Sequence, residues 1–146
     1  SIKKNKTILI QEKAEINTHD LENTVNTDSK WVIFILNQII QNSVKYRNKD
    51  ITPSIEIYSE QKKENVILYI KDNGIGIKKG EITRVFEKGF TGTNGRLSGK
   101  KSTGIGLYLC KKLCDKLGIA IELNSEQGKG TEIRIVFPNS SYTNLV

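Results

Sequence analysis

The feature that most constrains this chain is an apolar run that opens at Trp31 and has helical spacing. Asp28 or Ser29 stands just before the run, where a side-chain oxygen caps a helix. The pattern predicts a helix from about Ser29 to about Arg47. The apolar residues that set this spacing are Val32, Ile35, Leu36, Ile39 and Ile40.

One face of this predicted helix is polar. Gln38, Asn42 and Lys45 are four and three residues apart, so a helix brings them to the same side. An amide oxygen is a hard ligand that suits Mg²⁺, and a lysine one turn later suits a phosphate group. The alternative is an ordinary solvated face.

The composition is that of a single soluble globular domain. The chain has 146 residues, of which 36% are hydrophobic, and its formal net charge is +7. The charge suits a phosphate ligand, an acidic protein or non-specific nucleic-acid contact, but also a solvated basic surface. Cys110 and Cys114 lack partners for a zinc site, and we interpret them as buried residues in a reducing compartment. Because the chain begins at Ser1 rather than Met, we interpret it as part of a longer protein.

Short apolar segments predict several strands. One or two edge strands are expected between Lys6 and Ile16, and a hairpin from 54–59 and 65–71. The second strand of the hairpin is apolar at every position of 66–70, which predicts that both its faces are covered. Further strands are expected at 119–123 and 131–137, joined by a turn at 127–131. His19 is interpreted as a surface histidine, in loop or strand, without a function.

Glycine-rich segments follow two of the apolar elements. The sequence DNGIGI, 72–77, comes directly after the buried strand, and its glycines allow close approach of backbone to a ligand, although Asp-Asn-Gly is also common in turns. A short helix is expected at 81–86. A basic, glycine-rich loop then runs to Ser102 and is interpreted as a lid. A last helix is expected from Ser102 or Thr103 to Gly118, and the glycines in its first turn favour phosphate binding.

The order of these segments resembles that of a known family. Neither a Walker loop nor a Rossmann fingerprint is present. The sequence resembles the ATP-binding catalytic domain of sensor histidine kinases, whose Bergerat fold is shared with type II topoisomerases, MutL-type repair proteins and large heat-shock chaperones. The five segments that carry the resemblance are 38–46 (N box), 72–77 (G1), 86–90 (F box), 103–107 (G2) and 128–131 (G3). The resemblance covers most of residues 28–137, which we expect to be the core of a single domain spanning 1–146.

The resemblance implies an α+β two-layer sandwich. Its sheet would be mixed and mostly antiparallel, with about three helices on one face and a long ATP lid. Asn42 would hold Mg²⁺, with Gln38 beside it in the catalytic position, and Asp72 would accept a hydrogen bond from the adenine amino group. The other residues that the resemblance places around ATP are Lys45, Tyr46, Gly74, Gly76, Ile77, Phe86, Phe90, Lys100, Lys101, Thr103, Gly104, Ile105, Gly106, Leu107 and Thr131.

The same resemblance implies an activity and partners. The domain would transfer the γ-phosphate of ATP to a histidine on a separate dimerisation domain, from which it passes to an aspartate of a response regulator. Details such as STGIGLYLCKKLCDKLG, 102–118, resemble kinases that sense bacitracin and antimicrobial peptides, which have an ABC transporter as companion. This would be the cytoplasmic domain of a cell-membrane protein. His19 lacks the phosphoacceptor pattern, so the piece is not expected to phosphorylate itself. It is expected to be monomeric, because the family's usual dimer helices are missing, and to bind no nucleic acid.

Three alternatives use the same motifs. Topoisomerases and chaperones carry a glutamate at the position of Gln38, and an amide is a very poor general base, which argues against an ATPase of that kind. A serine kinase that regulates a sigma factor is the second alternative, and the basic lid argues against it. The third is a degenerate module without catalytic activity.

Overall fold

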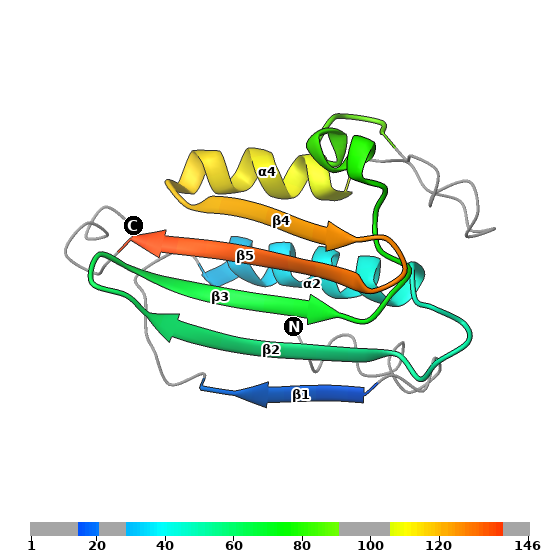
Figure 1. Cartoon of the computed structure of the whole chain (residues 1–146). Coiled ribbons are helices and arrows are strands. Elements are labelled where there is room, and N and C mark those ends of the chain that lie inside the picture. Colours follow the sequence, from blue (N-terminus) through cyan, green and yellow to red (C-terminus); the bar gives the residue numbers. More distant parts are fainter. Residues whose placement is uncertain (1–14, 21–28, 91–105, 139–146) are drawn as a thin grey trace.

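A five-stranded sheet with helices against one face makes up the part of the chain that the structure describes. The structure is a computed structural model, and it describes residues 15–20, 29–90 and 106–138. The strand order is β1-β2-β3-β5-β4. Only β1 and β2 pair in parallel, while the other neighbours are antiparallel (Figure 1). The predicted α+β sandwich with a mixed, mostly antiparallel sheet is therefore confirmed.

The elements follow the predicted order along the chain. The helices are α2 (Ser29–Lys45), the 3₁₀-helix η1 (Lys79–Arg84) and α4 (Gly106–Leu117). The strands are β1 (Glu15–His19), β2 (Ser54–Gln61), β3 (Asn65–Asp72), β4 (Ala120–Glu126) and β5 (Gly130–Pro138). The predicted strand before residue 15, the lid and the cap at Ser102 or Thr103 lie outside the described residues. No helix among those described is long and apolar enough to cross a membrane.

The core lies between the sheet and the two α-helices. Its buried side chains come from one face of α2, from α4 and from alternate positions of β2, β3 and β5. The predicted outward and inward positions on β5 are confirmed, because Ile133, Ile135 and Phe137 are buried. Cys110 and Cys114 are also fully buried where α4 faces the core. Burial raises the pKa of the Cys110 thiol to about 12, so it is packed as a small apolar group rather than a reactive one.

The other face of the sheet has no helix against it among the described residues, so the prediction that both faces of β3 are covered stays a prediction. Val66 and Ile70 are buried in the core, whereas Ile67 and Tyr69 lie on the opposite face and are half-buried. Cross-strand neighbours cover that face instead. The Tyr69 ring stacks on Tyr58 of β2 with centroids 4.6 Å apart.

His19 attaches the edge strand β1 to this open face. Its ring stacks on Tyr58 with centroids 4.8 Å apart, and its two nitrogens lie 2.8 Å from carboxylate oxygens of Asp20 and Glu56. These hydrogen bonds, to Asp20 and then to Glu56, raise the pKa of His19. The residue is a surface histidine in a strand, and its contacts are structural.

Helix α4 ends as the sequence predicts. Gly118 has a φ of +72°, and the amide of Ile119 donates to the carbonyl of Cys114 at 2.8 Å, which is the hydrogen bond of a Schellman motif. A Cβ at Gly118 would meet no atom within 4 Å. Gly76 has almost the same φ, +74°, but a Cβ there would lie 2.2 Å from the carbonyl oxygen of Glu126. A substitution at either glycine would therefore strain the backbone, but only one at Gly76 would also cause steric overlap.

We expect Gly118→Ala to lower the free energy of unfolding by about 1 kcal/mol, the cost of a left-handed non-glycine residue. Gly76→Ala should cost about 3 kcal/mol or more, because the methyl group would also displace the backbone of the β4–β5 turn. Urea unfolding of both variants measures the difference. Equal losses would show that the contact between Gly76 and the turn does not constrain the fold.

Candidate functional site

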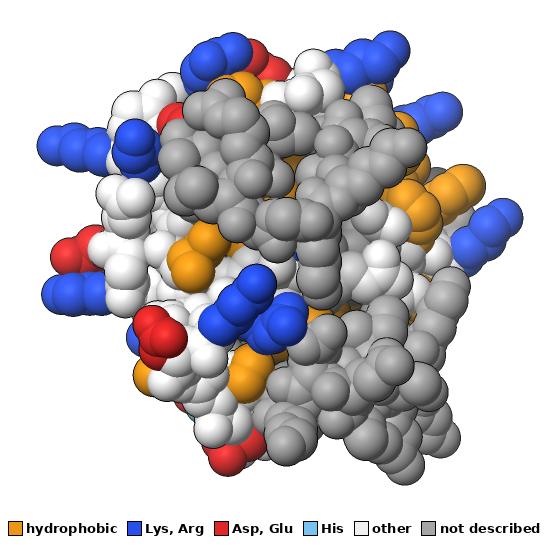
Figure 2. All heavy atoms as spheres, turned by 90° about the vertical axis from the view of Figure 1, so that its right-hand side faces the viewer, with side chains coloured by type: hydrophobic (Ala, Val, Ile, Leu, Met, Phe, Trp, Pro, Cys, Tyr) orange, Lys and Arg blue, Asp and Glu red, His pale blue; other side chains and the backbone are white. Residues whose placement is uncertain are grey.

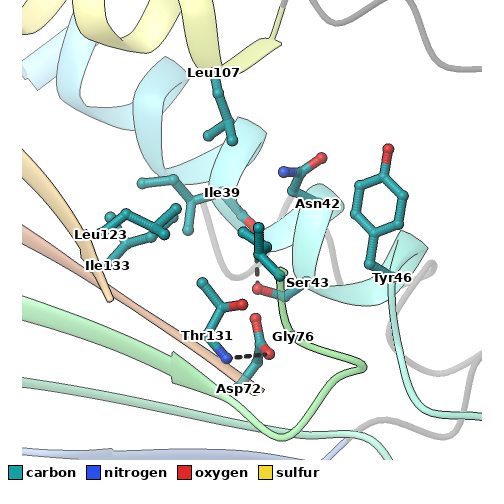
Figure 3. Close-up of a pocket in the computed structure, with 11 residues that line it drawn as sticks. Ile39, Asn42, Ser43, Tyr46, Asp72, Gly76, Leu107, Leu123, Thr131 and Ile133 are labelled. Atoms are coloured by element: carbon teal, nitrogen blue, oxygen red, sulfur yellow. Dashed lines mark hydrogen bonds between the residues drawn. The ribbon is translucent and has the colours of Figure 1, made fainter. Parts of the chain in front are cut away.

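A pocket lies between α2 and α4 at the end of the sheet where β3 stops. Its empty volume is about 390 Å³, including the space at its mouth. Figure 3 shows the apolar side chains of Ile39, Leu107, Leu123 and Ile133 along one side, with Asp72 and Thr131 at the base. The remaining lining residues are Asn42, Ser43, Tyr46, Gly76 and Ile77. A mainly apolar pocket with a few grouped polar atoms is the usual form of a small-molecule site.

Asp72 is the only carboxylate among these lining residues. It is the last residue of β3, and its Oδ1 accepts from the amide of Gly74 at 2.9 Å and from the amide of Thr131 at 3.2 Å. Desolvation raises the pKa of Asp72 above its ordinary value of 3.8, while hydrogen bonds from Gly74, Ser43 and Thr131 act in the opposite direction. The base of the pocket is thus a desolvated hydrogen-bond acceptor held in one orientation.

The loop after Asp72 is held by backbone hydrogen bonds on both sides. The amide of Ile75 donates to the carbonyl of Tyr46 at the end of α2 (3.0 Å), and the carbonyl of Ile75 accepts from the amide of Gly128 in the β4–β5 turn (2.8 Å). A Cβ at Gly74 would lie 2.6 Å from the Tyr46 carbonyl oxygen. The close approach for which Gly74 and Gly76 are needed is therefore an approach to protein backbone, and it fixes the position of Asp72.

The face of α2 that lines the pocket is turned by one residue from the predicted polar face. Ile39, Asn42, Ser43 and Tyr46 have helical spacing and line the pocket together. Of the predicted set, only Asn42 is among them. Ser43 was not singled out from the sequence, although its spacing from Ile39 and Tyr46 would have indicated it.

Gln38 and Lys45 lie near the pocket but are not part of its lining. The Gln38 Oε1 atom approaches the start of α4, where a Cβ at Gly106 would lie 2.8 Å from it. The Nζ atom of Lys45 lies 5.5 Å from the centre of the Tyr46 ring. Desolvation lowers the pKa of Lys45.

The two phenylalanines of the predicted F box have packing roles in the described structure. Phe86 packs against the core, and the guanidinium of Arg84 lies 4.5 Å from the ring centre of Phe90. Neither lines the pocket. Five predicted site residues, Lys100, Lys101, Thr103, Gly104 and Ile105, lie outside the described residues.

Basic side chains lie at this end of the molecule. Figure 2 views the structure from that end and shows lysine and arginine side chains there, with acidic side chains among them. Lys45, Arg47 and Lys49 follow one another near the end of α2, next to Asn42 and Tyr46. An anionic group at the mouth of the pocket would therefore lie in a favourable field.

Comparison with known proteins assigns the family. Residues 27–141 match the family described as "Histidine kinase-, DNA gyrase B-, and HSP90-like ATPase". The chain belongs to this family. Domains of the family bind ATP, which agrees with a pocket that combines apolar walls, a desolvated carboxylate and a basic mouth.

The relatives by sequence are sensor kinases. The chain is 43% identical over 118 residues to the sensor protein kinase GraS of Staphylococcus aureus (strain JH1). The matched residues make up 81% of this chain and 33% of that protein. The chain therefore spans about a third of the length of the curated relatives it matches. Over that third, the similarity is to a sensor kinase.

Solved structures show the same fold. The mycobacterial sensor histidine kinase MprB superposes with a TM-score of 0.79 at 23% identity, covering 93% of this chain and 91% of that one. Full-length ShkA in complex with AMPPNP superposes with a TM-score of 0.78 at 19% identity, covering 94% of this chain and 28% of that one. The fold predicted from the sequence motifs is thus confirmed.

We expect Asp72→Asn to leave the free energy of unfolding at pH 7 unchanged or to raise it. Burial disfavours the ionised carboxylate, so in the wild type this group lowers stability as the pH rises from its unfolded pKa through its raised folded pKa. The asparagine oxygen can still accept from Gly74 and Thr131. Urea unfolding between about pH 4 and pH 7 measures how steeply the free energy of unfolding changes with pH. The loss of stability with rising pH that Asp72 causes should be absent from the variant.

A matched control removes one negative charge from the same end of the sheet. Glu126 lies in an exposed position at the end of β4, where it pairs with Lys129. Glu126→Gln should change the free energy of unfolding by less than about 0.5 kcal/mol. A strongly destabilised Asp72→Asn at pH 7 would contradict the desolvation argument.

Proposed function

We propose that this chain is the ATP-binding catalytic domain of a two-component sensor histidine kinase. The observation that carries the proposal is the desolvated Asp72 carboxylate at the base of an apolar pocket, with Asn42 on the adjoining face of α2. Family membership and the similarity to GraS support it. The 146-residue chain would form one domain whose substrate, ATP, binds in this pocket.

The pocket suits an adenine ring. Ile39, Leu123 and Ile133 would lie against the faces of the ring, and the Asp72 carboxylate would accept a hydrogen bond from its amino group. Thr131 lies beside Asp72 at the base, and Tyr46 on α2 would pack near the ribose or the base (Figure 3). Gly74, Gly76 and Ile77 would contribute by holding the loop that carries Asp72.

Asn42 would hold the magnesium ion that accompanies ATP. Its amide is a neutral oxygen ligand on the pocket face of α2, and the described residues contain no group of three or more acidic, histidine or cysteine side chains that would form a metal site without phosphate. The chemistry that Mg²⁺ would supply there is neutralisation of part of the phosphate charge. One protein ligand plus phosphate oxygens is a common arrangement for this ion.

The phosphates would extend from the pocket toward the start of α4. Leu107 already reaches the pocket from the first turn of that helix, and Gly106 precedes it. Free amides at a helix start favour phosphate groups. Lys45 would meet a phosphate, as would Lys100 or Lys101, and the backbone of Thr103, Gly104 and Ile105 would complete the site, with Phe86 and Phe90 anchoring the start of the lid.

Gln38 favours transfer of the γ-phosphate of ATP to an acceptor over ATP hydrolysis. It lies one turn before Asn42, where a carboxylate would activate water, and an amide is a very poor general base. A site without such a base keeps ATP until an acceptor arrives. We propose that the acceptor is a histidine on the dimerisation domain of the parent kinase, and that the phosphoryl group then passes to a response-regulator aspartate.

The parent protein would be a cell-membrane sensor of the antimicrobial-peptide-sensing type, with this chain as its cytoplasmic domain and an ABC transporter as a possible companion. The similarity to the sensor kinase GraS supports this context. The isolated chain would be a monomer without nucleic-acid binding activity.

Calorimetry with ATP in the presence and absence of Mg²⁺ tests the nucleotide site. The wild type should bind MgATP in the micromolar range. Asp72→Asn should weaken binding about a hundredfold, because the asparagine NH₂ group would face the amino group of adenine. Asn42→Ala should remove the dependence on Mg²⁺. Failure of the wild type to bind ATP would contradict the proposed function.

Phosphoryl transfer is tested by adding the isolated phosphoacceptor hairpin of a related sensor kinase. The chain alone should not become labelled from radioactive ATP, whereas the hairpin should acquire a phosphate that is lost in acid and retained in alkali, as expected for phosphohistidine. An acid-stable phosphate on an added protein would instead favour the serine kinase. A hairpin whose histidine is replaced by glutamine provides the control.

A further inference from the structure

Ser125, near the end of β4, connects three parts of the candidate site without lining the pocket. Its Oγ accepts a hydrogen bond from the amide of Ile77 at 2.8 Å. It donates to the carbonyl oxygen of Gly130 at 2.8 Å. It also lies 2.8 Å from the hydroxyl oxygen of Thr131, where either oxygen could be the donor.

The donors and acceptors around Ser125 decide the direction of that third hydrogen bond. A serine hydroxyl has one hydrogen and two lone pairs. The Ile77 amide can only donate, so it takes one lone pair, and the Gly130 carbonyl can only accept, so it takes the hydrogen. The contact with Thr131 must then use the second lone pair of Ser125. Thr131 is therefore the donor, and its only hydroxyl hydrogen points toward Ser125.

In this arrangement the polar side chains at the base of the pocket offer a ligand only hydrogen-bond acceptors. The Thr131 hydroxyl, with its hydrogen committed to Ser125, has only lone pairs left for a ligand. The neighbouring Asp72 carboxylate is an acceptor when ionised, and its Oδ1 is already held by the amides of Gly74 and Thr131. The amino group at C6 of a purine can donate to acceptors of this kind, whereas a keto oxygen at C6 would face lone pairs from both residues.

We infer that Ser125 is a positioning residue for nucleotide specificity: by fixing the direction of the Thr131 hydroxyl, it makes the site select 6-amino over 6-keto purine nucleotides. The inference rests on the proposed function. Ser125 acts through Thr131, since it does not line the pocket itself. Without the Ser125 hydroxyl, the Thr131 hydrogen is free to rotate and to donate to a carbonyl oxygen in the pocket.

The test is calorimetric binding of ATP and of inosine triphosphate (ITP), in which a keto oxygen replaces the amino group. The wild-type chain should strongly prefer ATP. Ser125→Ala should reduce the ratio of the two affinities roughly tenfold, the size of one neutral hydrogen bond, through stronger ITP binding. Ser125→Thr keeps a hydroxyl group at this strand position, so this variant should have the same ratio of affinities as the wild type.

A second pair of variants separates selectivity from loss of structure. Thr131→Val removes the hydroxyl that Ser125 orients, so in that background Ser125→Ala should change the ratio no further. An unchanged ratio in Ser125→Ala, or an equal loss of affinity for both nucleotides, would overturn the inference and leave Ser125 a purely structural residue. A wild-type chain that binds ATP without preference over ITP would overturn it as well. A wild type that binds neither nucleotide would overturn the proposed function and this inference together.

Discussion

The site depends on the backbone hydrogen bonds that hold the loop after β3 between two other elements. Ile75 is bonded on one side to the carbonyl of Tyr46, the residue that follows α2, and on the other to the amide of Gly128 in the β4–β5 turn. Asn73 adds a third attachment, since its side chain accepts from the amide of Ser54 and donates to the carbonyl of Thr52. These bonds require glycine where the chains touch, and together they orient Asp72.

A carboxylate held in this way is suited to recognition rather than to ion pairing. Its burial costs free energy, as the raised pKa of Asp72 indicates, and no described lysine or arginine pairs with it to offset that cost. The backbone amides of Gly74 and Thr131 supply part of the compensation. Such a cost is tolerated where a ligand provides the missing donor, which connects the energetics of the fold to adenine recognition.

Much of the fold was predictable because its signals are local. Helical spacing indicated α2 and α4, a positive-φ glycine ended α4, and alternation on β5 divided core from surface residues. Asp72, Asn42 and Thr131 were also identified from the motifs, and the structure brings them to one pocket. The sequence did not decide the covering of β3, since an apolar strand is compatible both with two covered faces and with one covered face and a stack of aromatic rings.

The sequence by itself determined which elements form, which residues carry hydrogen-bonding groups near glycines, and the family. Only the tertiary structure decided how those groups are used. The pocket face of α2 is set by packing against the sheet, so it includes Ile39 and Ser43 instead of Gln38 and Lys45. The partners of Gly74 and Gly76 are distant in sequence, as are the contacts of Ser125 with Ile77. Spacing along a chain specifies periodicity, whereas such contacts depend on which elements become neighbours in space.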